Sequence, residues 1–84
     1  MREVTVYSME ACVTCEQIKG MLDAREIPYK EIVMAPDSAA VDELAERSGM
    51  RTLPQVFVGS ILIGGGSETM AAASSGMLAD LLVD

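Results

Sequence analysis

The sequence contains no histidine and no tryptophan, and its only aromatic residues are Tyr7, Tyr29 and Phe57. Without imidazole, the chain lacks the usual general base near neutral pH and the commonest metal ligand in proteins. With so few rings, the core must be mostly aliphatic, and the seven methionines are available to fill irregular gaps. These absences argue against histidine-dependent catalysis and histidine-ligated metal sites.

Basic residues are also scarce, with six Lys and Arg against 13 Asp and Glu, giving a net charge of −7. A face able to follow a phosphate backbone is therefore not expected, and nucleic acid is excluded as a partner. No apolar stretch approaches the roughly 20 residues of a spanning helix, and the first residues do not resemble a secretion signal. The expectation is a soluble, cytoplasmic, monomeric protein with no membrane partner, and one domain over residues 1–84.

The chain has two cysteines, Cys12 and Cys15, three positions apart. A disulfide between them would close a trivial loop and contribute little stability. In a reducing compartment, a C-x-x-C pair indicates redox or metal chemistry. The cysteines are therefore candidates for chemistry and not for structural cross-linking.

Hydrophobic periodicity predicts an alternation of strands and helices. Helices are expected directly after Cys12, before Gly49, and after Ser67 as an N-cap, with the last helix broken or bent at Gly76. The residues 36–38 supply turn and cap chemistry for the second helix. Strands are expected over residues 2–8, 29–33, 55–58 and 61–63. The order β-α-β-α-β-β-α implies an α/β fold with a mixed four-stranded sheet and helices on both faces.

The cysteine pair falls at the turn from the first strand into the first helix. Cys12 is expected at the helix N-terminus, where free N–H groups and the helix dipole favour thiolate and lower the pKa of its thiol. Cys15 lies one turn further, on the apolar face, and should be more buried. Residues so spaced have Cα atoms about 5 Å apart, which suits a disulfide. Cys12 could therefore attack a substrate disulfide, and Cys15 could resolve the mixed disulfide.

The cysteine pair allows two other interpretations. Both cysteines could be structural thiols of the core. A zinc site is less favoured, because two thiolates with no histidine and no second C-x-x-C cannot complete a tetrahedral centre. No metal is therefore expected. Glu10 and Glu16 flank the cysteines, and they are interpreted as ordinary surface charges.

Two further segments are weaker signals when taken alone. A cis bond before Pro54 would turn the Leu53 backbone outward, where it could pair with an extended thiol peptide; a trans proline that starts a strand is the alternative. The glycine run 64–66 could offer N–H groups to a carboxylate, or form a simple turn. Arg51 could pair with a carboxylate or be solvated.

Taken in order, Cys12-Val13-Thr14-Cys15, Thr52-Leu53-Pro54 with the following residues 55–59, and the turn 63–65 resemble the glutaredoxin family over essentially the whole chain. The resemblance implies a thioredoxin fold, a cis Pro54, glutathione as reductant, and a role in electron transport and cell redox homeostasis. It implies Cys12 as the nucleophile and Cys15 as the resolving thiol. The glutathione site that it implies comprises Thr14, Arg51, Thr52, Leu53, Pro54, Gly65, Gly66, Ser67 and Glu68.

The chain departs from the usual family pattern at three places. Val13-Thr14 replaces a proline and an aromatic residue, Met9 replaces a lysine that pairs with glutathione, and Gly66 replaces a cysteine. The Cys-Val-x-Cys pair is similar to that of redoxins that thioredoxin reductase reduces and that supply ribonucleotide reductase, although these carry a tryptophan that is absent here. Ribonucleotide reductase is a possible partner in either case. A carrier of an iron–sulfur cluster between two chains is the third alternative.

Overall fold

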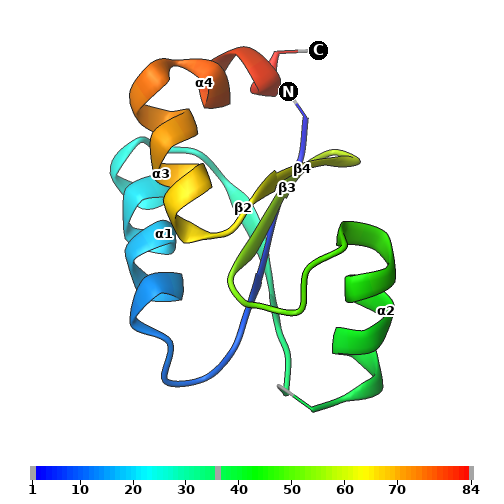
Figure 1. Cartoon of the computed structure of the whole chain (residues 1–84). Coiled ribbons are helices and arrows are strands. Elements are labelled where there is room, and N and C mark those ends of the chain that lie inside the picture. The colour runs from blue at the N-terminus through cyan, green and yellow to red at the C-terminus, as the bar shows by residue number, and fades with distance from the viewer. Residues whose placement is uncertain (1, 36, 84) are drawn as a thin grey trace.

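The computed structural model describes residues 2–35 and 37–83, so Pro36 of the predicted turn lies outside the described residues (Figure 1). The strands and helices follow the predicted order, with one additional helix at the end. They are β1 (Val4–Ser8), α1 (Val13–Ala24), β2 (Tyr29–Val33), α2 (Ala39–Ser48), β3 (Gln55–Val58), β4 (Ile61–Gly64), α3 (Gly66–Ser75) and α4 (Met77–Leu82).

The four strands form one mixed sheet in the order β2-β1-β3-β4. β1 pairs in parallel with β2, and Ser8 lies opposite Val33 at the end of this pair. β1 and β3 are antiparallel, as are β3 and β4. Parallel strands need a long crossover, which α1 supplies, whereas the antiparallel β3–β4 pair needs only a short turn. The predicted mixed four-stranded sheet is confirmed.

Each face of the sheet carries its own hydrophobic cluster, because successive strand residues point to opposite faces. On one face, Val4 and Val6 pack with Ile18 of α1 and with the buried residues of α3 and α4. On the other face, Tyr7 and Phe57 pack with Leu44 of α2. Figure 1 shows α2 standing apart from α1 and α3, with the sheet between them. Helices therefore cover both faces, as predicted.

Two helices end at a glycine as predicted, whereas the predicted start of the last helix is wrong. Gly49 ends α2 with a φ of 76°, a left-handed conformation that glycine adopts without a Cβ clash, as expected. Gly76 likewise has a φ of 87° and separates α3 from α4, so the predicted last helix is broken and not merely bent. The prediction that Ser67 caps α3 is wrong, because the N-cap residue is Gly65.

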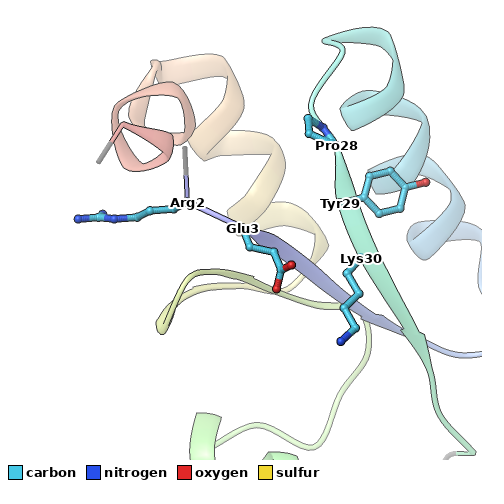
Figure 2. A pocket seen from close by; sticks show the side chains of 5 residues that line it. All are labelled: Arg2, Glu3, Pro28, Tyr29 and Lys30. Atoms are coloured by element: carbon cyan, nitrogen blue, oxygen red, sulfur yellow. The ribbon is translucent and has the colours of Figure 1, made fainter.

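The two ends of the sheet differ in what surrounds them. The chain leaves β1 toward Cys12, and β2 ends at the same edge, since the two strands are parallel. At the opposite end, a cavity of about 280 Å³ is lined by Arg2, Glu3, Pro28, Tyr29 and Lys30 (Figure 2). In the part of the chain that the structure describes, no helix is long and apolar enough to cross a membrane.

Candidate active site

The cysteine pair lies where β1 turns into α1. Cys12 is the N-cap residue, with extended backbone angles, and the first residue of α1 is Val13. The backbone N–H of Cys15 donates to Cys12 Sγ at 3.1 Å, so the sulfur itself accepts from a helix N–H that has no partner within the helix. The two Sγ atoms form a disulfide, and their Cα atoms lie 5.2 Å apart. This confirms the expected spacing of the pair.

The two sulfurs differ in exposure. Cys12 is half-buried, whereas Cys15 is 1% exposed and belongs to the apolar face of α1. Cys12 is therefore the cysteine that a substrate sulfur can reach, and it lies at a helix N-terminus, where the positive dipole and the N–H groups stabilise a thiolate. Cys15 is placed to react with Cys12 from inside. The geometry suits one entering and one resolving sulfur.

The loop before β3 contains the predicted cis peptide bond, between Leu53 and Pro54. A buried side chain that the sequence analysis did not assign, Gln55, holds this loop. Its Nε2 donates to the carbonyl oxygens of Met50 at 2.8 Å and of Thr52 at 3.0 Å. Because Gln55 is 1% exposed, these bonds are shielded from water and fix the loop on the end of β3. Thr52 remains exposed and Leu53 half-buried at the surface.

Arg51 does not lie free beside this loop. One of its terminal guanidinium nitrogens is 2.8 Å from Asp42 Oδ1 on α2. Both side chains are more than half exposed, at 69% and 63%, so solvent screens the pair. An incoming carboxylate at Arg51 would have to share the guanidinium with Asp42.

The N-terminus of α3 is closed by its own carboxylate. Glu68 Oε1 accepts from the backbone N–H of Gly65 at 3.0 Å, and Glu68 Oε2 accepts from the Ser67 hydroxyl. These hydrogen bonds, that of Ser67 first, hold the pKa of Glu68 below its ordinary value. Thr69 Oγ1 donates back to the Gly65 carbonyl at 2.8 Å. The carboxylate takes the capping role that was predicted for Ser67, because Glu68 stands three residues after the N-cap.

Three of the predicted site segments meet at Gly66. A Cβ on Gly66 would overlap the Cγ2 methyl of Thr14 and would lie 3.9 Å from Pro54 Cγ. A Cβ on Gly65 would lie 3.6 Å from the Pro54 carbonyl oxygen. The start of α1, the loop at Pro54 and the start of α3 are therefore in contact, and the approach depends on the absence of a side chain at Gly66. Arg51, also predicted to belong to the site, instead pairs with Asp42 of α2.

A cluster of polar side chains joins α1 to β1 and β2, and it was not predicted from the sequence. Lys19 of α1 lies 2.9 Å from both Glu16 Oε1 and Glu31 Oε2, and the buried Ser8 hydroxyl donates to Glu31 Oε2 at 2.7 Å. The bond to Glu31, then that to Glu16, raises the pKa of Lys19, and Lys19 in turn lowers the pKa of Glu31. The cluster ties α1 to the edge strand β2. The Glu16–Lys19 pair has the i,i+3 spacing of a helix and could be found in the sequence. The contacts of Glu31 with Lys19 and Ser8 depend on how β2 lies beside α1 and β1, and the sequence gives no signal for them.

The positions of the side chains that could ligate a metal ion bear on whether Cys12 and Cys15 form a metal site. Among residues 2–35 and 37–83, no three His, Cys, Asp or Glu side chains converge as a metal site would require. Glu31 and Glu16, the carboxylates of the polar cluster, are instead paired with Lys19.

Comparison with known proteins identifies relatives for nearly the whole chain. Residues 4–63 match the family model described as glutaredoxin. Glutaredoxin 3 of Escherichia coli (strain K12) is 32% identical over 98% of this chain and 99% of its own length. A glutaredoxin of Ricinus communis is 37% identical over 96% of this chain and 82% of its own.

Solved structures agree with the sequence relatives. The crystal structure of a buckwheat glutaredoxin–glutathione complex has a TM-score of 0.85, 29% identity, and coverage of 96% of this chain and 76% of that one. The solution structure of a glutaredoxin from Brucella melitensis has a TM-score of 0.83, 33% identity, and coverage of 98% and 89%. These glutaredoxin structures share the fold of this chain over nearly its whole length.

Proposed function

This chain belongs to the glutaredoxin family and is a thiol–disulfide oxidoreductase, and we propose that glutathione restores its Cys12–Cys15 disulfide to the dithiol. The observation that supports the oxidoreductase most directly is the half-buried sulfur of Cys12 as the N-cap of α1, with the buried Cys15 bonded to it. The related buckwheat glutaredoxin forms a complex with glutathione, which supports the choice of reductant.

In the forward direction, the Cys12 thiolate attacks one sulfur of a substrate disulfide. The substrate S–S bond breaks, a Cys12–substrate disulfide forms, and the other substrate sulfur leaves as a thiolate. Cys15, after losing its proton, attacks Cys12 Sγ, forms the intramolecular disulfide and releases the second substrate thiolate. Two electrons pass from the dithiol to the substrate, whose two thiolates take up protons from water.

Regeneration consumes two glutathione molecules. The first glutathione thiolate attacks Cys12 Sγ, which forms a mixed disulfide and releases Cys15 as a thiolate. The second attacks the sulfur of the bound glutathione, forms glutathione disulfide and releases the Cys12 thiolate. The balance is two glutathione thiols oxidised for one protein disulfide reduced.

The groups that would hold glutathione come from the contact region around Gly66. The Thr52–Pro54 loop would pair with the extended cysteinyl part of the peptide. The N–H groups of Gly66 and Ser67 at the start of α3 would donate to the γ-glutamyl carboxylate, and the Glu68 charge would face its ammonium group. Thr14, beside Gly66, and Arg51 would flank the ligand, with Arg51 toward the glycine carboxylate.

A second reductant, a flavoprotein of the thioredoxin reductase class, is favoured by one observation. Arg51 is engaged by Asp42 at 2.8 Å, and Met9 supplies no charge, so the glycine carboxylate of glutathione has little cationic support. A charged hydrogen bond that is not made costs roughly 1.5–3 kcal/mol, which weakens binding about tenfold or more. A reductase that docks on the protein surface does not depend on that contact.

Reduction of a small disulfide in two coupled systems tests the proposal. One contains glutathione with glutathione reductase, and the other contains thioredoxin reductase without glutathione. Turnover with glutathione is expected, and Cys12→Ser is the control that must be silent in both. Turnover only in the thioredoxin reductase system, and none in the glutathione system, would overturn glutathione as the reductant while leaving the oxidoreductase activity intact.

The cellular setting forms part of the same proposal. A dithiol of this kind works in a reducing compartment, and the cytoplasm is proposed, with the chain acting as one domain and as a monomer in electron transport. Ribonucleotide reductase is proposed as a protein substrate because its turnover requires reduction of a disulfide. Reduction of that enzyme by the purified protein, followed through deoxynucleotide formation, tests this assignment.

A further inference from the structure

A second cavity lies at the same end of the sheet as the cysteines. It has a volume of about 390 Å³ and is lined by Glu10, Val33, Met34 and Ala35. Glu10 is two residues before Cys12, so the two Cα atoms are at most about 7 Å apart. The cavity therefore borders the position that a substrate residue next to the reacting cysteine would occupy. We refer to these four lining residues as the Glu10 groove.

The backbone explains why the groove forms here. β1 and β2 end together, with Ser8 opposite Val33, and the N–H of Met34 donates to the Ser8 carbonyl at 2.8 Å. The chain then leaves β1 through a turn at Glu10 and Ala11, where Ala11 has a φ of 55°. The two chain segments diverge from this last hydrogen bond, and the space between them is the groove.

The walls of the groove are of two kinds. Val33 is 56% exposed although it is a large aliphatic residue, and Met34 and Ala35 continue the apolar wall. Glu10 is exposed and supplies one carboxylate on the side of Cys12. A long aliphatic side chain that ends in a cation matches both walls, because lysine and arginine pack their stems on apolar surface and keep the charge at a polar site.

Among residues 2–35 and 37–83, no basic side chain lines the Glu10 groove, and the basic residues lie elsewhere. Lys19 is held by Glu16 and Glu31, and Arg51 is held by Asp42. Arg47 lies over the rings of Tyr7 and Phe57 on the face of α2. Arg25 caps the far end of α1, and Arg2 and Lys30 line the cavity at the opposite end of the sheet. With a net charge of −7, the protein favours a cationic partner at this surface.

We propose that the Glu10 groove binds a lysine or arginine beside the reacting cysteine of a protein substrate, so that the protein selects basic cysteine segments. The stem would pack on Val33, Met34 and Ala35, and the cationic head would meet the Glu10 carboxylate. This inference rests on thiol–disulfide exchange at Cys12 and is independent of which reductant restores the dithiol. It assigns a specificity-determining role to a residue outside the glutathione contacts.

Single-turnover oxidation of the reduced protein by peptide disulfides tests the groove without any reductant. The probes are symmetrical disulfides of the peptide Ala-Xaa-Cys-Xaa-Ala, blocked at both ends, in which Xaa is Lys, norleucine or Glu. Each rate is divided by the rate of the same disulfide with dithiothreitol, which removes the intrinsic effect of Xaa on sulfur reactivity. Stopped-flow mixing gives the normalised rate at about 0.02 M and about 0.5 M salt.

The lysine peptide is expected to react about tenfold faster than the glutamate peptide at low salt, with norleucine between them. Glu10→Gln should reduce this ratio at least about threefold, and Glu10→Lys should reverse the preference. Glu3→Gln is the matched control, since it removes the same charge at the distant cavity of Figure 2 and should leave the ratio unchanged. The ratio is used because a change in Cys12 reactivity would alter all three rates equally.

A second variant tests the apolar wall. Val33→Thr keeps the shape of an exposed side chain and replaces one methyl by a hydroxyl, so folding should be preserved. It should slow the lysine and norleucine peptides about twofold to fivefold relative to glutamate. Equal normalised rates for all peptides, equal losses in Glu10→Gln and Glu3→Gln, or equal rates for norleucine and lysine would each overturn the proposal. Failure of every peptide to oxidise the protein would overturn it together with exchange at Cys12.

Discussion

The N-termini of α1 and α3 contact each other through Thr14 and Gly66, yet they satisfy their free backbone groups in different ways. At α1, the acceptor is the sulfur of Cys12, which can change its covalent partner. At α3, the acceptor is the carboxylate of Glu68, which cannot. The N-terminus of one helix thus holds a reacting group, and the N-terminus of the other holds a fixed carboxylate cap.

Replacing Cys12, the sulfur at the N-terminus of α1, should have the largest effect on activity. Cys12→Ser should lower disulfide reductase turnover at least about a thousandfold, because a serine hydroxyl does not exchange with disulfides. The α3 surface and the fold should be unchanged. The measurement is steady-state reduction of a small disulfide, with circular dichroism to verify folding.

Cys15→Ser is the matched control for that variant. It retains the attacking sulfur, so it should form a mixed disulfide that mass spectrometry detects as one added substrate half. The mixed disulfide should persist, because no second sulfur resolves it. Turnover that survives in Cys12→Ser would refute the assigned roles of the two cysteines.

The contact between the two helix ends can be tested by filling it. Gly66→Ala should destabilise the protein by about 1–3 kcal/mol, because its Cβ would overlap the Thr14 methyl. In a Thr14→Ser background, which lacks that methyl, the penalty should largely disappear. Urea unfolding of the four proteins in this cycle gives the coupling.

Gly20 provides the control for helix propensity. It lies within α1, and a Cβ there would meet nothing within 4 Å. Gly20→Ala should therefore stabilise the protein by about 0.5–1 kcal/mol. If Gly66→Ala also stabilises it, the close approach of the two helix ends is not a constraint.

The carboxylate cap of α3 should make stability depend on pH. The pKa of Glu68 is lower in the folded protein than in the unfolded chain, so its stabilising contribution is present above the unfolded pKa, near 4.3. It is lost as pH falls through the folded pKa. Glu68→Gln should therefore be less stable than wild type at pH 7, and the difference should shrink as the pH falls through the folded pKa of Glu68.

Urea midpoints measured across this pH range for wild type and Glu68→Gln provide the comparison. Glu46→Gln, an exposed site on α2, corrects for the general effect of removing one acidic side chain. A difference between wild type and Glu68→Gln that does not shrink at low pH would show that the cap acts through contacts other than the charge.

The smallest expected effect concerns the ion pair between Arg51 and Asp42. Asp42→Asn should release the guanidinium, and the KM for glutathione should fall about twofold to threefold, since exposed ion pairs contribute about 0–1 kcal/mol. Stability should change little. An unchanged KM in the coupled assay would place Arg51 outside the glutathione site.

The fold could be predicted from the sequence because its main signals are local. Alternation over residues 29–33 and the stripe of Ile18 and Leu22 indicate a strand and a helix by themselves. The cysteine pair was predictable for the same reason, since a C-x-x-C after a strand defines both the N-cap and the first turn. These signals require no knowledge of distant contacts.

The parts that could not be predicted depend on pairings across the fold. Gln55 is one of four consecutive buried residues in β3, and nothing in its neighbours shows that its amide holds the loop at Thr52. The hydrogen bond between Ser8 and Glu31 requires the β1–β2 register. The sequence favours Ser67 as the N-cap of α3, because a serine hydroxyl is a capping group and Gly65, the actual N-cap, has no side chain to indicate its role.

The pH dependence of alkylation of the reduced protein, in the Cys15→Ser background, measures the pKa of the Cys12 thiol. It therefore shows whether the N-terminus of α1 holds Cys12 as a reactive thiolate. The rate should follow one titration with a midpoint clearly below 8.5, the value of an ordinary cysteine. A midpoint at or above 8.5 would show that the helix end does not activate the sulfur, and would contradict the account.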